Sequence, residues 1–267
     1  MINKITSRDN ASVKRAKKLS SSPKEREKHG LFFIEGLRIS LDALKSGVDI
    51  EEVFYTQKAL DKWKDSVEML VSDCRKSYLI NDSIASFISD TQTPQGIFCV
   101  CKMLDKPLDL DKIGNKRFII GLENIQDPSN MGTIIRTAEA LAINTIILSK
   151  NCCDIYSPKV LRGSMGGVFR TSFVYVDSFK DAICRLNALG VNTYASVIDK
   201  DAKLITDLSF ANGNKMVIIG NEGNGISKET ISCCKERITI PMPGRAESLN
   251  ASIAASLSMF YLSKLTN

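Results

Sequence analysis

Two stretches decide the fold, and the first reads KMVIIGNEGNGIS at positions 215–227. Its apolar run Met216–Ile219 stops at Gly220, which predicts a buried strand that ends in a glycine loop open to a ligand. The glycine spacing is G-x-x-G-x-G and not the dinucleotide fingerprint G-x-G-x-x-G, and no Walker lysine follows. The spacing therefore disfavours a nicotinamide oxidoreductase, whereas ordinary turn glycines of an α/β domain remain an alternative.

The second stretch reads RITIPMPGRAESLNASIAASLSMFY at positions 237–261. A short strand predicted at 238–240 meets Pro241, which cannot continue a sheet ladder and turns the chain outward. Ser248-Leu249-Asn250 then begins a predicted long helix. Two loops and a helix start that carries Ser and Asn would form a cradle for a small polar molecule.

The composition is typical of a soluble globular protein, with 43% hydrophobic and 25% charged residues in a chain of 267. This length can hold two domains. No apolar run reaches the roughly 18 residues of a membrane span. The first residues lack the apolar core of a secretory signal, so we expect a cytoplasmic protein without membrane contact. An organelle-targeting sequence remains an alternative.

Cysteine and histidine usage bears on metal binding and redox state. The chain has eight cysteines and one histidine, with no C-x-x-C pair. No usual set of zinc ligands can be read from this pattern. We therefore expect reduced thiols, no disulfide framework and no metal.

Positive charge is concentrated in the first 30 residues, where nine lysines and arginines face three acidic residues. This segment accounts for the whole net charge of +6. On a helix, Lys14, Lys17 and Lys18 would share a face, and with Arg15 they form a basic N-terminal arm suited to a polyanion such as RNA. The alternative is an ordinary solvated surface helix.

Strand and helix patterns alternate along the chain and predict two α/β domains. We interpret residues 1–103 as the first domain, the charged stretch 104–115 as a linker, and residues 116–267 as the second domain. In the second domain, the alternation predicts a largely parallel sheet covered by helices on both faces. Ser129 or Asn130 is expected to cap its first helix.

Three separated segments resemble the motifs of one enzyme family. Asn124…Asp127-Pro128-x-Asn130-x-Gly132…Arg136 resembles the first motif of the SPOUT RNA methyltransferases, in the branch called TrmH or SpoU. Residues 217–226 and 240–250 resemble the second and third motifs, and Ser157-Pro158-Lys159…Arg162 also fits the branch. Phe32–Arg38 and Thr93-Pro94-Gln95-Gly96 resemble its substrate-binding domain, so the resemblance covers nearly the whole chain.

The resemblance implies a fold and an activity. It implies an α/β SPOUT domain with a deep trefoil knot, a rare exception to unthreaded topology, and an N-terminal ribosomal-protein-like (L30e-like) domain that binds RNA. Family members transfer a methyl group from S-adenosylmethionine to a ribose 2′-hydroxyl of RNA, usually as homodimers. Ribosomal RNA of the 23S type is the expected substrate. A transfer RNA substrate, or a catalytically silent RNA-binding dimer, remains an alternative.

The resemblance also implies roles for individual residues. Those implied in catalysis are Arg136, Asn130, Glu222, Ser248 and Asn250. Those implied in cofactor binding, largely through backbone groups, are Gly220, Asn221, Glu222, Gly223, Ile240, Met242, Leu249 and Asn250. Those expected to contact RNA are Lys14, Arg15, Lys17, Lys18, Arg38 and Arg162. Because an arginine stays protonated, we expect Arg136 to position an RNA phosphate and stabilise a developing alkoxide.

Overall fold

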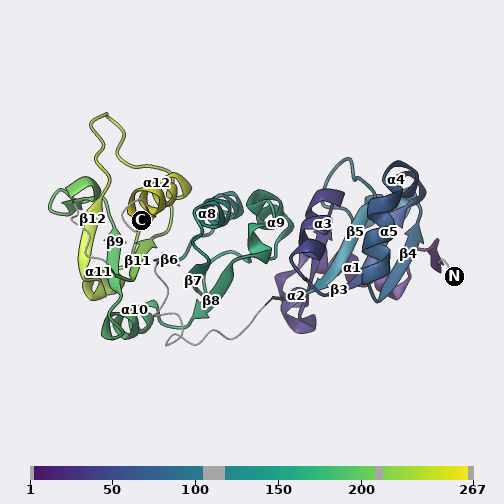
Figure 1. The fold of residues 1–267 in the computed structure, drawn as a ribbon, viewed down its shortest axis with the longest axis horizontal. Helices are drawn as coiled ribbons and strands as arrows, with labels where there is room; N and C mark the ends of the chain where they lie inside the picture. Colours follow the sequence, from purple (N-terminus) through teal and green to yellow (C-terminus); the bar gives the residue numbers. More distant parts are fainter. Residues whose placement is uncertain (1–2, 105–117, 208–212, 264–267) are drawn as a thin grey trace. The chain divides into compact units, whose positions relative to one another are not determined.

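The computed structural model describes residues 3–104, 118–207 and 213–263. Its internal contacts divide the chain into two compact units, whose residues can be located by the colour bar in Figure 1. Unit 1 comprises Met1–Leu104 and Asp154–Phe169, and unit 2 comprises Asp105–Cys153 and Arg170–Asn267. Beyond residue 104, the predicted linker lies outside the described residues.

Unit 1 is built on a five-stranded mixed sheet in the order β1-β4-β3-β5-β2. Strands β1 and β3 run parallel to β4, whereas β5 runs antiparallel to β3 and β2. The strands are β1 (Asn3–Ile5), β2 (Leu31–Glu35), β3 (Ile50–Thr56), β4 (Lys76–Ile80) and β5 (Ile97–Lys102). The helices are α1 (Ala11–Ser21), α2 (Pro23–His29), α3 (Leu37–Lys45), α4 (Gln57–Lys62), α5 (Lys64–Asp73), α6 (Asp82–Ile88), α9 (Pro158–Ser164) and the 3-10 helix η1 (Gly167–Phe169).

The basic N-terminal segment is part of the packed body of unit 1. Helix α1 begins after Asn10, whose side chain accepts a hydrogen bond from the Ser12 N–H. Val13, Ala16 and Leu19 recur at helical spacing and are fully buried in a cluster that includes Phe33. The basic side chains are therefore presented from a fixed helix.

Unit 2 contains a seven-stranded sheet in the order β10-β12-β9-β11-β6-β7-β8, and every pair in it is parallel. This confirms the predicted parallel sheet. The strands are β6 (Phe118–Leu122), β7 (Thr145–Ser149), β8 (Ser172–Val176), β9 (Asn192–Ser196), β10 (Lys203–Leu204), β11 (Lys215–Ile219) and β12 (Glu236–Thr239). The helices are α8 (Pro128–Ala140), α10 (Phe179–Ala188), the 3-10 helix η2 (Ile205–Asp207), α11 (Lys228–Cys233) and α12 (Ala251–Ser263).

The central strands β6 and β11 are buried along their whole length. Near-continuous apolar runs are typical of parallel strands that are covered on both faces. Helix α10 packs on one face, where Phe179 and Ile183 join Met216 and Ile218 in one cluster. Helices α8 and α12 lie together on the opposite side in Figure 1, and α12 packs against β11. The carboxyl ends of β6 and β11 are thereby placed beside α8 and α12.

The start of α8 differs from the sequence prediction. The Asp127 carboxylate accepts hydrogen bonds from the Ser129 N–H at 2.5 Å and the Asn130 N–H at 3.1 Å, and Pro128 is the first helical residue. The prediction that Ser129 or Asn130 caps this helix is wrong, because a carboxylate directly before a proline fits the cap and first-turn positions better. The Asn130 side chain is thereby left available for other contacts.

Three structural features concern compartment and metals. Within residues 3–104, 118–207 and 213–263, no helix has the length and apolarity needed to cross a membrane. All eight cysteines are free thiols. In the same ranges, no group of three or more His, Cys, Asp or Glu side chains is arranged to hold a metal ion.

A buried carboxylate anchors the segment that follows the glycine loop. Glu123 is 6% exposed and lies directly after β6. It accepts hydrogen bonds from the Ser227 N–H at 2.9 Å, the Ser227 hydroxyl at 2.8 Å and the Thr230 hydroxyl at 2.7 Å. Glu123 therefore joins the end of β6 to the start of α11.

We expect Glu123→Ala to lower the free energy of unfolding by about 2 kcal/mol, because it leaves buried donors without an acceptor. Urea unfolding at pH 7, followed by circular dichroism, measures this change. Ser232→Ala is the matched control, since the exposed Ser232 hydroxyl donates only to the Glu229 carbonyl of its own helix. Equal losses in the two variants would contradict the anchoring role.

Candidate active site

A cleft of about 400 Å³ opens at the carboxyl end of β11, between the loops that the two diagnostic stretches form. Its walls include the exposed Ile198 and the start of α12. The predicted residues that line it are Gly220, Asn221, Glu222, Gly223, Ile240, Met242, Ser248 and Leu249. One hollow thus gathers most of the residues that the resemblance implies in cofactor binding.

The loop after β11 folds back tightly on itself. Asn221 and Gly225 exchange two backbone hydrogen bonds, at 3.0 and 2.9 Å. A Cβ atom at Gly220 would lie 2.1 Å from the Gly225 carbonyl carbon and 2.3 Å from the Ile226 nitrogen, so no larger residue fits there. Gly225 has a φ of +68°, which glycine adopts without strain. The glycine spacing therefore serves a compact loop at the mouth of the cleft.

Three side chains distant in sequence form a polar network beside the cleft. The Asn130 Nδ2 donates to Glu222 Oε1 at 2.9 Å, and the Asn250 Nδ2 donates to Asn130 Oδ1 at 3.0 Å. Asn250 Oδ1 accepts from the Ser252 N–H at 2.9 Å and so caps α12. The structure therefore brings together three of the five residues implied in catalysis.

Glu222 is held by several donors although the residue is exposed overall. Burial acts to raise the pKa of this carboxyl, but hydrogen bonds from Asn130 and from backbone N–H groups outweigh it and lower the pKa below its ordinary value. The backbone donors include Gln126 at 3.4 Å and Asp127 at 3.3 Å. Glu222 is thus ionised at neutral pH and fixed to the start of α8.

Asn124 and Ser149 support the loops, although no site role was expected for either of them. The Asn221 Nδ2 donates to the Asn124 carbonyl at 2.8 Å, which ties the glycine loop to the segment after β6. Asn124 has a φ of +58°, and its N–H donates to the Ser149 hydroxyl at 2.8 Å. The position of Asn124 in the first motif was a usable signal, whereas nothing in the sequence singles out Ser149.

Arg136 and Ser248 lie outside this network. Arg136 is exposed on α8 and makes no hydrogen bond or ion pair with any residue that the structure describes. Ser248 is exposed at the rim of the cleft. The guanidinium is therefore available to a ligand or a partner chain.

The residues expected to contact RNA all lie in unit 1. Lys14 pairs with Asp9 at 2.7 Å, and Arg15 pairs with the buried Glu52 at 2.8 Å. The Lys17 Nζ lies 5.8 Å from the centre of the Phe87 ring, where a cation–π contact is favourable. The remaining three are Lys18, Arg38 and Arg162, all exposed. Arg15 is thus committed to an internal ion pair, whereas the others keep solvent access.

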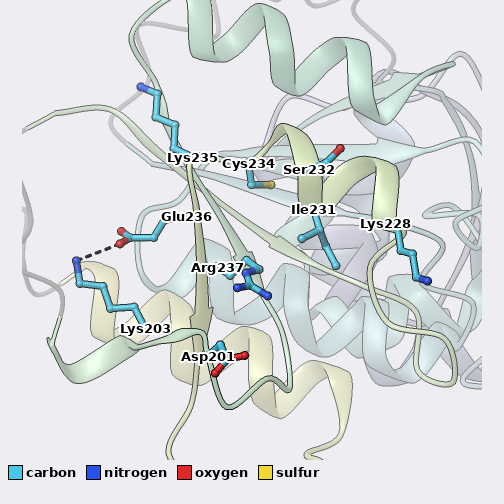
Figure 2. Close-up of a pocket in the computed structure, with 9 residues that line it drawn as sticks. All are labelled: Asp201, Lys203, Lys228, Ile231, Ser232, Cys234, Lys235, Glu236 and Arg237. Carbon is cyan, nitrogen blue, oxygen red and sulfur yellow. Dashed lines mark hydrogen bonds and ion pairs between the residues drawn. The ribbon is translucent and has the colours of Figure 1, made fainter.

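A larger hollow of about 620 Å³ in unit 2 shares only Ile231 with the cleft (Figure 2). Three of the six charged side chains that line it form ion pairs within the described chain, with Lys203 3.0 Å from Glu236 and Arg237 paired with Asp199. Lys228 and Lys235 point away from each other in Figure 2. None of the predicted site residues lines this hollow, and we assign it no role in the chemistry.

Comparison with known protein families gives two matches. Residues 117–260 match the family described as SpoU rRNA Methylase. Residues 10–99 match the domain described as MRM3-like substrate binding domain. Together the two matches cover most of the chain.

Individual relatives are similar over almost their full lengths. The chain is 31% identical to the 23S rRNA (guanosine(2553)-2'-O)-methyltransferase RlmP of Bacillus subtilis, over 97% of this chain and 98% of the relative. It is 28% identical to the 23S rRNA (uridine(2479)-2'-O)-methyltransferase of Streptomyces viridochromogenes, over 96% and 90% respectively. The crystal structure of an AdoMet-bound rRNA methyltransferase from Sinorhizobium meliloti superposes with a TM-score of 0.87 at 26% identity, over 98% of each chain.

We expect the pKa of Glu222 to lie below 4.5 and to rise in Asn130→Ala, which removes the strongest of the lowering contacts. A lowered pKa stabilises the folded state above the unfolded-state pKa, and this contribution is lost as the pH falls through the folded-state value. NMR titration of the Glu222 carboxyl ¹³C chemical shift measures this pKa in the wild-type protein and in Asn130→Ala. An unchanged midpoint in Asn130→Ala would contradict the assigned contact.

Proposed function

Since the chain belongs to the SpoU rRNA methylase family, we propose that it transfers a methyl group from S-adenosylmethionine to a ribose 2′-hydroxyl of ribosomal RNA. The proposed substrate is ribosomal RNA of the 23S type. The observation that carries this proposal is the convergence of the three motif segments on one cleft, beside the Asn130–Glu222–Asn250 network. The relatives named as 23S rRNA 2'-O-methyltransferases support the RNA class.

The cleft suits S-adenosylmethionine, which supplies the methyl group as an activated sulfonium. Its volume of about 400 Å³ lies in the range of small-molecule sites. The apolar walls that would contact a nucleoside and the methylene groups of its amino-acid chain are formed by Val197, Ile198, Met242 and Leu249. We propose that backbone groups at Gly220, Ile240 and Leu249 provide the polar contacts, with Asn221 and Gly223 shaping the loop.

The polar network has a positioning role in this proposal. Methyl transfer is an in-line displacement, so the protein chiefly aligns the ribose oxygen with the methyl carbon. Glu222 orients Asn130, and Asn250 holds Asn130 from the other side. We propose that Asn130, Ser248 and Asn250 contact the ribose, with Glu222 fixing the arrangement.

Arg136 supplies positive charge at the reaction site. As the 2′-hydroxyl loses its proton, negative charge develops on its oxygen. The new bond from this oxygen to the methyl carbon neutralises that charge while the carbon–sulfur bond of the donor breaks and S-adenosylhomocysteine leaves. A guanidinium cannot accept that proton because it remains protonated. We propose that Arg136 binds the neighbouring phosphate and stabilises the alkoxide, while the proton passes to the phosphate or to water.

A homodimer formed through helix α12 would place Arg136 at the interface between the two chains. Helix α12 exposes Ile253, Leu257 and Phe260 by 45–48%, and their spacing places them on one face. Arg136 precedes Thr137, whose hydroxyl lies 3.2 Å from that of Ser256 on α12. We propose that this apolar face meets its copy in a second chain and that Arg136 acts at the dimer interface.

The strand order supports a trefoil knot in unit 2. Strand β12 lies beyond β9, away from β11, yet the next helix α12 packs against β11 and α8. The chain must therefore return across the carboxyl end of β11 through the long loop between β12 and α12 (Figure 1). We propose that this return passes through the loop that follows β11.

The domain roles follow the two family matches. We propose that residues 1–103 form an L30e-like domain that binds RNA and that residues 116–267 perform the transfer. The proposed RNA contacts are Lys14, Lys17, Lys18 and Arg38 in the first range and Arg162 in the second. Arg15 supports this surface through its ion pair with Glu52. The eight free thiols support a reducing compartment, which we propose is the cytoplasm.

The function is tested by single-turnover methylation of unmodified 23S rRNA, with the product located by 2′-O-methyl mapping. Arg136→Lys should lower the rate at least 100-fold, because a lysine cannot reproduce the planar, bidentate contact. Its affinity for S-adenosylhomocysteine should remain unchanged. A near-normal rate would remove the proposed role, and wild-type protein that binds the cofactor but methylates no RNA would favour a catalytically silent RNA-binding dimer.

The dimer is tested separately by light scattering on the full chain. Leu257→Glu should give monomers and a methylation rate at least tenfold lower, because it places a charge on the proposed contact face. Leu189→Glu is the control, since Leu189 is 41% exposed at the end of α10. A wild-type monomer that methylates rRNA would contradict the dimer.

A further inference from the structure

Unit 1 contains a cavity of about 410 Å³ that the reaction chemistry does not use. It opens where β2 passes into α3, and the loop 91–95 and helix α9 close its other sides. The residues that carry the argument are Arg38, Ile39, Asp42, Thr93, Leu161 and Arg162. All of them belong to unit 1, so the cavity lies within one compact body.

The fixed polar groups around this cavity are mostly occupied by one another. Both oxygens of Glu35 accept hydrogen bonds, from the Ser89 hydroxyl at 2.6 Å, the Thr91 hydroxyl at 2.5 Å and the Asp90 N–H at 2.8 Å. Gln95 Oε1 accepts from the Leu37 N–H at 3.0 Å. These contacts occupy the Glu35 carboxylate and the Gln95 side-chain oxygen, which leaves Asp42 as the unpaired carboxylate among the described residues that line the cavity.

Three charged side chains around the cavity can still bind a ligand. Arg38 is exposed, and its side chain has no hydrogen bond or ion pair to the described part of the chain. Among the residues that the structure describes, Arg162 makes its one ion pair through a single terminal nitrogen, 2.9 Å from Asp90. The Asp42 carboxylate lines the cavity, likewise without a partner among the described residues. Two cations at the rim and one free acceptor inside are thus available to a ligand.

The walls between these groups are apolar. Ile39 from α3 faces the cavity together with the buried Leu161 and the half-exposed Met165 from the end of α9. Apolar side chains next to arginines suit an extruded base, which packs between the apolar side chains while the guanidinium groups bind its phosphate. A carboxylate accepts hydrogen bonds only, so Asp42 favours a base whose edge carries N–H donors.

We propose that this cavity holds one unstacked nucleotide of the RNA substrate, with its base against Ile39, Leu161 and Met165 and its phosphate on Arg38 and Arg162. The proposal rests on the proposed function, in that the ligand is part of the RNA that the protein modifies. It identifies unit 1 as a reader of a single-stranded or bulged nucleotide. A double-stranded segment keeps its bases stacked and could not enter.

The first experiment fills the cavity. Thr93→Trp adds a large side chain at an exposed lining position, and Gln92→Trp adds the same side chain at an exposed neighbour that does not line the cavity. Affinity for in vitro transcribed, unmodified 23S rRNA is measured at fixed salt, without methyl donor. Thr93→Trp should weaken binding about tenfold, because the base can no longer enter the cavity and its contacts there are lost. Gln92→Trp should stay within twofold.

A second pair of variants tests the phosphate contact without adding bulk. Arg38→Ala should weaken rRNA binding and reduce the slope of log affinity against log salt by about one, as expected for one lost phosphate contact. Lys45→Ala, at the far end of the same helix, should leave the slope unchanged. Affinity for S-adenosylhomocysteine should stay constant in all four variants, which reports on folding.

The outcomes separate this proposal from the proposed function. Wild-type affinity in Thr93→Trp, or equal losses in both tryptophan variants, would overturn the nucleotide site even if methylation is normal. Tight rRNA binding that depends on Thr93 and Arg38, without any methyl transfer, would support the site and remove the proposed function. Wild-type protein that does not bind the transcript would overturn both.

Discussion

The site depends on the two hydrogen bonds of the Asn130 side chain. Asn130 lies on α8, and its partners lie 92 and 120 residues further along the chain, in the loop after β11 and at the start of α12. Because Asn130 donates to a carboxylate and accepts from an amide, its neighbours determine the orientation of its own amide. Removing any one of the three leaves the others with unmatched polar groups. These hydrogen bonds therefore couple the positions of the glycine loop, α8 and α12.

Much of unit 2 can be predicted from sequence because its strands are buried. The runs 118–122 and 215–219 are apolar throughout or nearly so, and the loops that follow them carry the motif residues. The order of the strands cannot be predicted in this way, since nothing in these runs says that they pair with each other. Caps are also difficult to assign: Asp127, Ser129 and Asn130 are all good capping residues, and only the structure shows which side chain turns inward.

The free surface charge is harder to predict from the sequence than the buried apolar strands. A count of charged residues does not show which of them form ion pairs within the protein. The first 30 residues carry six excess positive charges. Two of the basic side chains form ion pairs inside the protein. Arg15 pairs with Glu52, and the buried Arg26 pairs with Asp154 at 2.6 Å. Their partners lie far away in the sequence and could not be identified from it. The free positive surface of α1 is therefore formed by fewer side chains than the composition suggests.

The return of residues 154–169 to unit 1 has a consequence for how such a protein can be divided or recombined. The Phe32 ring lies 4.8 Å from that of Tyr156 and 6.3 Å from that of Phe169, and Arg26 depends on Asp154 for its charge partner. A fragment that stops near residue 103 would lose these neighbours and leave a buried guanidinium unpaired, at a cost of about 3 kcal/mol or more. Exchange of the N-terminal half between homologues therefore succeeds only when this distant insert is exchanged with it.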